Sequence, residues 1–555
     1  MQFSKVPFTA KVLGIVLVLL GIFFRFYHLD SKVFWNDEVY SAVPVSGYTV
    51  EGITDEWQPG SENTRLTSAE VLQRYQTLAP NTTVNDTLQS IAVEEPQNSP
   101  LYFILSRQWI ELTNLSPRSG MRSLAALISV IGLPFAYLLC LELFSDRAIA
   151  WLGTGLIAIS PLHIIYAQEA RQYSLLITLT LIASFAFLHA LRLSSPLRWA
   201  FYSLTAVLGL YSHPFFCFVL LAHGVYLFGL EGSWRQPLKL TRSLQSFLIA
   251  IAASLLGFLP WLVIIFNRVE RISPWRGNTE LSLPQLIGRW IVNLARVFYD
   301  LPLGTLRLYD LQINLVDPSL YIVLFLVALV GYAIWDMVQW AERKTWLFIL
   351  TLVIFPAIFL VLADVFLGGV RSTIPRYILP SYIGIQLAIA HLLARPRRIG
   401  IVSAPWPRLW RFIAAFMLTA SCISSVVLLQ SKTWWSKYSN LYDPAIATLI
   451  NTSNINTSNT PVVISESALR LISLSYLLEP TTGLQVADEE NLPDLPQNVS
   501  PENAVYVYDA RSSDTRLKEA IEQNYGWSFE QLYREPFGFI DGQIQLWKYP
   551  KTPNE

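Results

Sequence analysis

Long apolar runs separated by shorter polar segments dominate the first 430 residues of the chain. A membrane-spanning helix needs roughly 20 mostly apolar residues. Eleven runs approach or exceed this length: 7–27, 121–144, 148–166, 174–191, 199–212, 214–230, 244–266, 319–340, 346–367, 375–394 and 409–430. The pattern predicts a mainly α-helical, polytopic membrane protein with about 11 transmembrane helices.

The predicted orientation of the spans follows from basic residues, which collect in cytoplasmic loops. Alternate loops carry Arg147, the pair Arg192 and Arg198, and the pair Arg343 and Lys344. We therefore expect a multi-pass plasma-membrane protein with a cytoplasmic N-terminus and, after an odd number of spans, an extracytoplasmic C-terminus.

One further apolar run opens at Pro100-Leu-Tyr and continues to Glu111, but it is short and carries charged residues. Counting it as a span would place the later basic loops outside. We predict instead an interfacial helix on the outer surface.

Three polar regions lie on the predicted outer side: a first loop over 28–120, a second long loop over 267–318, and the tail over 431–555. The tail has strand-like runs at 461–465 and 504–508, a helix-like run at 514–524 and a predicted hairpin at 538–549. We predict two domains. Residues 1–430 form the transmembrane domain with both loops, and residues 431–555 form a small extracytoplasmic α/β domain.

Composition agrees with a membrane protein, since 53% of residues are hydrophobic and only 14% are charged. Forty basic residues balance forty acidic ones, which argues against nucleic acid as a partner. The three cysteines, Cys140, Cys217 and Cys422, lie in apolar runs and offer neither a disulfide framework nor metal-ligand spacing.

The first candidate for chemistry is the pair Asp37-Glu38, just beyond the first span on a predicted short helix. A carboxylate near a membrane boundary tends to have a raised pKa, which suits a general base. The alternative is a helix-capping or interfacial pair.

Further polar motifs fall on the same predicted outer side. They are Gln168-Glu-Ala-Arg-Gln-Tyr173 between the third and fourth spans, His213 beside Pro214, and Arg376-Tyr377 at the start of the tenth span. Arginine binds phosphate through two donors, and a helix N-terminus adds positive dipole. Headgroup contacts, interfacial anchoring and a helix break at Pro214 are the alternative interpretations.

Taken together, the motifs resemble the membrane-embedded GT-C glycosyltransferases of the protein O-mannosyltransferase, lipid A aminoarabinose transferase and bacterial lipopolysaccharide-type sugar transferase group. The resemblance rests on the stretches 25–40, 100–102, 168–173 and 375–380 and covers the membrane region to about residue 430. It implies a hexosyl- or pentosyltransferase at the outer membrane face. Such an enzyme moves a sugar with inversion from a polyprenyl-phosphate donor to a hydroxyl of a glycan, lipid or protein acceptor.

The resemblance also implies roles for individual residues. Asp37 would be the general base, Glu38 its supporting carboxylate and Glu169 a second acid near the sugar. Arg171 and Arg376, with Tyr377 alongside, would neutralise the leaving lipid phosphate in a region of low dielectric. The other substrate-binding candidates are Arg25, Tyr40, Gln168, Tyr173 and His213. We expect no cofactor and no metal, although the three carboxylates are also oxygen ligands that suit a divalent cation.

Two other functions share some of these features. A ligase or oligosaccharide transferase would use the same lipid phosphate site with a longer glycan. A lipid or sugar transporter (flippase) would place ionisable residues near the bilayer midplane and show repeated halves. The acidic motifs here lie at span ends and no repeated halves stand out, which favours a transferase.

Overall fold

A computed structural model describes residues 8–59, 64–232, 241–271, 281–302, 313–394, 406–435, 437, 440–452, 461–493, 495, 504–509, 515–534 and 544–550. The chain forms two compact units. The membrane unit contains residues 1–29, 95–102 and 122–430. The α/β unit contains residues 30–94, 103–121 and 431–555. The predicted division at residue 430 assigns the first outer loop to the membrane domain, whereas most of that loop belongs to the α/β unit.

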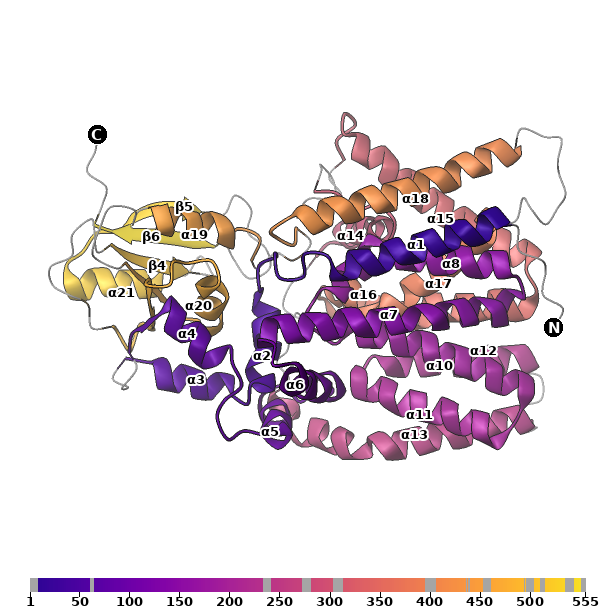
Figure 1. The fold of residues 1–555 in the computed structure, drawn as a ribbon, viewed down its shortest axis with the longest axis horizontal. Helices are drawn as coiled ribbons and strands as arrows, with labels where there is room; N and C mark the ends of the chain where they lie inside the picture. Colours follow the sequence, from indigo (N-terminus) through magenta and orange to yellow (C-terminus); the bar gives the residue numbers. More distant parts are fainter. Residues whose placement is uncertain are drawn as a thin grey trace. The chain divides into compact units, whose positions relative to one another are not determined.

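Helices occupy all eleven predicted spans and form a bundle, which Figure 1 shows in indigo, magenta and orange. Their bounds are α1 (Phe8–Phe26), α7 (Pro117–Phe144), α8 (Arg147–Ala158), α9 (Pro161–Ala167), α10 (Tyr173–Leu193), α11 (Pro196–Ser212), α12 (Phe216–Glu231), α13 (Arg242–Asn267), α15 (Pro318–Trp340), α16 (Arg343–Leu367), α17 (Leu379–Ala394) and α18 (Trp406–Gln430).

Six of these helices, α7, α10, α13, α15, α16 and α18, are long and apolar enough to cross a membrane. The bent pair α8 and α9 would make a seventh span, and α12 and α17 are shorter apolar helices. The protein is therefore polytopic, and the count of eleven spans stays a prediction.

The predicted span 148–166 is not one straight helix, because α8 and α9 meet at an angle of 58°. Pro161 begins α9 and has no N–H to donate to the carbonyl four residues earlier, that of Ile157. The Arg25 guanidinium donates instead to the carbonyls of Ile157 and Ala158, at 3.4 and 2.5 Å. A buried cation thus stabilises the break.

The predicted span 375–394 also begins later than expected. Residues Arg371–Thr373 and Pro375–Tyr377 form two short 3-10 turns, and α17 begins only at Leu379. Pro375 fixes the backbone in a turn conformation, and Pro380 then occupies the first turn of α17, where proline is tolerated. Arg376 and Tyr377 therefore lie in a turn ahead of the helix.

The second long loop contains an amphipathic helix, α14 (Leu283–Arg296), which packs against α15 and the 3-10 turn Arg371–Thr373. A 3-10 turn at Val269–Arg271 follows α13.

The α/β unit contains a six-stranded sheet whose order is β1-β3-β2-β4-β6-β5. Its strands are β1 (Leu66–Thr67), β2 (Val462–Ser465), β3 (Gly483–Val486), β4 (Val505–Asp509), β5 (Glu530–Arg534) and β6 (Gln545–Tyr549). Strand β2 runs parallel to β3 and β4, and the other neighbours are antiparallel. The helices of this unit are α2 (Asn36–Val45), α3 (Val50–Trp57), α4 (Ser68–Tyr75), α5 (Val84–Glu94), α6 (Leu101–Thr113), α19 (Asp443–Thr452), α20 (Ala468–Ser475) and α21 (Arg516–Tyr525).

The strands predicted at 461–465 and 504–508 are confirmed, as is the helix over 514–524, which forms α21 between 516 and 525. The hairpin predicted at 538–549 is confirmed only in its last strand, β6, whose partner is β5 at 530–534. Residues 538–543 lie outside the described residues. Strand β1 comes from the first outer loop, so this loop and the tail share one sheet.

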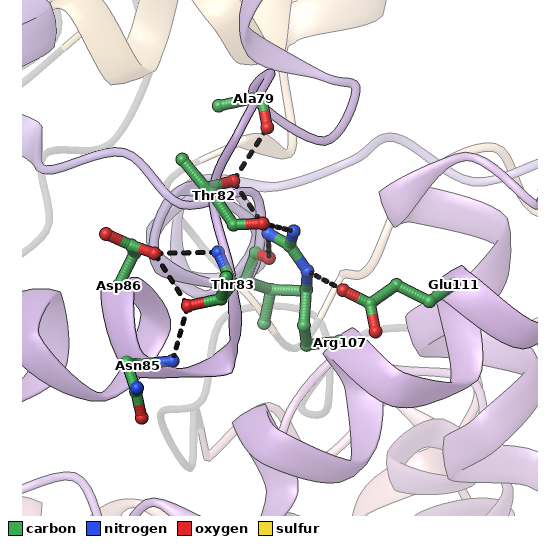
Figure 2. A network of polar contacts seen from close by, with 8 residues as sticks. Ala79, Thr82, Thr83, Asn85, Asp86, Arg107 and Glu111 are labelled. Carbon is green, nitrogen blue, oxygen red and sulfur yellow. Dashed lines mark hydrogen bonds and ion pairs between the residues drawn. The ribbon is translucent and has the colours of Figure 1, made fainter.

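Arg107 on α6 connects three parts of the α/β unit (Figure 2). Its guanidinium donates to Glu111 at 2.6 Å, to the Val45 carbonyl at 3.2 Å and to the Thr82 carbonyl at 2.6 Å. The arginine side chain is 3% exposed. The charged residue that argued against a span at 100–111 thus ties α6 to the last residue of α2 and to the turn before α5. The interfacial position of α6 stays a prediction.

Candidate functional site

Two arginines meet around one tyrosine at one end of the membrane unit. Arg171 lies in the link between α9 and α10, and Arg376 lies in the 3-10 turn Pro375–Tyr377. Their guanidinium carbons are 5.9 and 5.6 Å from the ring centre of Tyr173, the first residue of α10. Both arginines are largely buried. The structure therefore concentrates two positive charges in a region of low dielectric, an arrangement that favours an anionic ligand.

Two more rings complete this aromatic cluster. His213, in the turn after α11, lies 6.0 Å from Tyr173 and 6.2 Å from Tyr377, measured between ring centres. Arg376 lies 5.5 Å from the Tyr377 ring. Burial, and then the charges of Arg171 and Arg376, lower the pKa of His213 to about 3. At neutral pH the imidazole is uncharged, and its Nδ1 accepts a hydrogen bond from the Phe215 N–H at 3.1 Å, so Nε2 is the ring nitrogen that carries the proton.

Glu169 belongs to the same link and is fully buried. Its carbonyl accepts a hydrogen bond from the Arg171 N–H at 2.7 Å, which closes a tight turn. The next polar residue, Gln172, donates to Asn98 at 3.2 Å. The α9–α10 link therefore presents acidic, basic and amide groups within five residues.

The loop that carries Arg376 is held by residues that sequence reasoning did not single out. Trp290 and Asn293 of α14 donate to the Ser372 hydroxyl at 2.9 Å and to the Thr373 carbonyl at 2.6 Å. The Asp364 carboxylate accepts from the Ser372 N–H at 2.5 Å. The amphipathic pattern of residues 283–296 was the available signal that the second long loop, 267–318, contains a helix.

Two residues predicted to bind substrate, Arg25 and Gln168, make structural contacts within the membrane unit. The Gln168 amide donates to the carbonyls of Phe24 and Tyr27, at 2.9 and 2.8 Å, which caps the end of α1. Arg25 donates to Ser129 at 2.8 Å and to Gly21 at 2.7 Å, in addition to the carbonyls at the α8–α9 break. A contact of either residue with substrate stays a prediction.

Replacing Arg25 with methionine is expected to destabilise the protein more than it impairs substrate binding. The substitution leaves the Ile157 and Ala158 carbonyls without their donor, at a cost of about 1–3 kcal/mol for each buried group. Thermal unfolding of the purified protein should show a lower midpoint, and the KM of the folded fraction should stay near the wild-type value. A normal midpoint with a raised KM would instead assign Arg25 to substrate.

Asp37, Glu38 and Tyr40 lie on α2 in the α/β unit. The predicted short helix after the first span is confirmed. Glu38 is fully buried and accepts a hydrogen bond from the Trp35 N–H at 3.2 Å, so it caps the helix. Asp37 and Tyr40 are half-buried. Within the pair, Asp37 is thus the carboxylate that reaches solvent, while Glu38 has a structural contact at the helix N-terminus.

The C-terminal tail supports the start of α2. The Asn440 side chain accepts from the Asn36 N–H at 2.8 Å, and the Ser473 hydroxyl donates to the Phe34 carbonyl at 2.6 Å. Asn440 in turn donates to Ser473 at 2.9 Å and to Asp443. Burial raises the pKa of Asp443, and the nearby Arg470 opposes this shift. No sequence motif signals these contacts, because the partners are about 400 residues apart.

The structure thus brings together six of the predicted site residues within the membrane unit: Glu169, Arg171, Tyr173, His213, Arg376 and Tyr377. The other unit holds Asp37, Glu38 and Tyr40. Among the described residues, no group of three or more histidine, cysteine, aspartate or glutamate side chains is arranged to hold a metal ion. Metal independence stays a prediction.

Comparison with known proteins identifies the architecture. The crystal structure of ArnT from Cupriavidus metallidurans bound to undecaprenyl phosphate matches with a TM-score of 0.51 and 14% identity, over 98% of each chain. The chain has the GT-C fold. This confirms the predicted resemblance at the level of the fold.

Other structures with the GT-C fold were also found. The apo structure of the same ArnT has a TM-score of 0.49 at 14% identity, covering 97% of this chain and 98% of that chain. Archaeal oligosaccharyltransferase AglB from Archaeoglobus fulgidus, in complex with an inhibitory peptide and a dolichol-phosphate, has a TM-score of 0.43 at 12% identity, covering 90% and 69%. No protein-family profile matches the chain, and no curated protein matches it in sequence.

Proposed function

We propose that this protein is an inverting glycosyltransferase that moves a sugar from a polyprenyl-phosphate donor to an acceptor hydroxyl at the outer face of the plasma membrane. The observation that carries the proposal is the convergence of Arg171 and Arg376 on Tyr173 at one end of an apolar bundle. A protein of the same fold has been crystallised with undecaprenyl phosphate, which supports a lipid phosphate as the ligand.

The arginine pair suits the leaving group of such a reaction. When the bond between the anomeric carbon and the phosphate oxygen breaks, negative charge grows on the lipid phosphate. Two guanidinium groups offer planar, paired donors to its oxygens and are always charged. The neutral His213 adds no third positive charge to this pair. Glu169, in the same link, is the proposed acid beside the sugar.

Asp37 is the proposed general base. It would take the proton of the acceptor hydroxyl, whose oxygen attacks the anomeric carbon from the face opposite the phosphate. Glu38, as the cap of α2, would orient its neighbour. The proposed reaction uses no metal.

Release of the lipid carrier tests the function without knowledge of the sugar. Purified protein would be incubated with an extract of bacterial polyprenyl-phosphate sugars and with lipid, glycan and peptide acceptors. Mass spectrometry should then detect free polyprenyl phosphate and an acceptor heavier by one sugar. An acceptor heavier by a long glycan would indicate a ligase, and a donor that crosses the vesicle membrane intact would indicate a flippase. No change in any donor would contradict the proposal.

A further inference from the structure

Helices α1, α8, α17 and α18 lie in the bundle that Figure 1 shows, and the residues at one end of these helices line a cavity. Its volume is about 370 Å³, within the range of roughly 300–1,000 Å³ of ligand-binding pockets. Its walls include Leu17, Leu152, Leu393 and Leu418, and Trp410 and Arg411 also line it. Arg376 precedes α17, whereas Leu393 and Ala394 of the cavity are the last residues of α17, so this cavity is separate from the candidate site.

The walls of the cavity suit a hydrocarbon chain. Apart from Arg411, its lining residues are apolar or aromatic, and three alanines with small side chains are among them: Ala10, Ala148 and Ala414. Apolar walls of this kind suit apolar ligands. In a bilayer the available apolar ligand is a lipid chain.

The charges around the cavity suit an anionic headgroup. Arg411 itself lines it, and the first turns of three of its helices carry Lys11 on α1, Arg147 on α8 and Arg408 on α18, all exposed. The nearby acid Asp146 accepts from the N–H of Ala148 at 2.7 Å and caps α8. Basic residues therefore outnumber acidic ones where the apolar walls end, a combination that binds anionic lipids.

The aromatic residues beside the cavity agree with a headgroup level. Trp410 stacks on Tyr332 of α15 with ring centres 5.8 Å apart and planes 17° from parallel. Tryptophan and tyrosine collect at the boundary between hydrocarbon and headgroups. A phosphate at this depth would lie beside Arg411, with an acyl chain along the leucines.

We propose that the cavity between α1, α8, α17 and α18 binds an anionic phospholipid of the leaflet opposite to the candidate site, with its phosphate at Arg411 and one acyl chain against the apolar walls. Such a lipid would fill the space between four helices of the bundle. The site is independent of the proposed sugar transfer.

Native mass spectrometry of the full-length protein tests this site. Protein in detergent would be offered equal amounts of synthetic phosphatidylglycerol and phosphatidylcholine with the same acyl chains. We expect wild-type protein to retain more phosphatidylglycerol than phosphatidylcholine. Arg411→Gln should lower the retained phosphatidylglycerol about tenfold, the effect of one charge-assisted hydrogen bond. Ala414→Phe should lower it by filling the cavity.

Arg242→Gln is the matched control, because Arg242 is an exposed arginine in the first turn of α13 and does not line the cavity. It should retain phosphatidylglycerol as wild type does. The elution profile in size-exclusion chromatography and the thermal midpoint identify a variant that fails to fold. If one cavity variant fails to fold, lipid retention by the other cavity variant tests the proposal. Equal retention of both lipids by wild type, unchanged retention in folded cavity variants, or polyprenyl phosphate from the host membrane in their place would overturn the proposal.

Discussion

Asp37→Asn is expected to lower the rate of sugar transfer by a factor of about 10² to 10⁴, the usual contribution of a general base. Asparagine keeps the size of the side chain but cannot accept the proton of the acceptor hydroxyl. The cap of α2 is unaffected, since that hydrogen bond belongs to Glu38. Initial rates of polyprenyl phosphate release measure the effect, and the KM for the donor should change little.

Asp55→Asn provides the matched control, because Asp55 is an exposed carboxylate on α3 in the same unit. It should leave both the rate and the thermal midpoint unchanged. If Asp37→Asn transfers sugar at the wild-type rate, the general base lies elsewhere. If its midpoint falls together with its rate, Asp37 has a structural role.

Arg376→Gln is expected to raise the KM for the lipid-linked donor about 10- to 100-fold, which corresponds to about 1.5–3 kcal/mol for a hydrogen bond to a charged group. Glutamine retains donors but loses the charge that the phosphate requires. Arg376→Lys should restore part of the affinity, because lysine keeps the charge without the planar pair of donors. Adding Arg171→Gln should have a larger effect than either substitution alone.

Equilibrium binding of undecaprenyl phosphate gives a readout that does not depend on the sugar or the acceptor. The Arg376 and Arg171 variants should bind this lipid more weakly. Arg198 lies in the first turn of α11, whereas His213 of the candidate site follows the last residue of this helix. The Arg198→Gln variant should therefore bind the lipid normally. Normal binding by the double variant would exclude the arginine pair as the phosphate site, whatever its effect on transfer.

The sequence predicted the helices of the bundle and the polar motifs at their ends because both signals are local. An apolar run of 20 residues has few alternatives to a membrane helix. The α8–α9 bend could have been anticipated from Pro161, but not the use of Arg25 to satisfy the freed carbonyls. That contact joins residues more than 130 positions apart.

The residues of the candidate site could be predicted from the sequence, but the hydrogen bonds that hold their loops could not. The motifs containing Arg171 and Arg376 were recognised, and the structure gathers them on Tyr173. The hydrogen bonds that hold their loops come from α14, Asp364 and Asn98, which carry no motif. The first outer loop could not be assigned to the sheet of the tail, since β1 has two residues and its partner follows about 400 residues later.

Helix α2 is held at both ends, by Asn440 at Asn36 and by Arg107 at Val45. A side chain on such a helix loses most of its positional freedom when the unit folds, before any substrate arrives. In the proposed mechanism, the backbone that carries Asp37 is therefore ordered before the acceptor hydroxyl arrives, and more of the binding free energy remains to lower the barrier. In the proposed mechanism, the tail would thereby lower the entropy cost of activation.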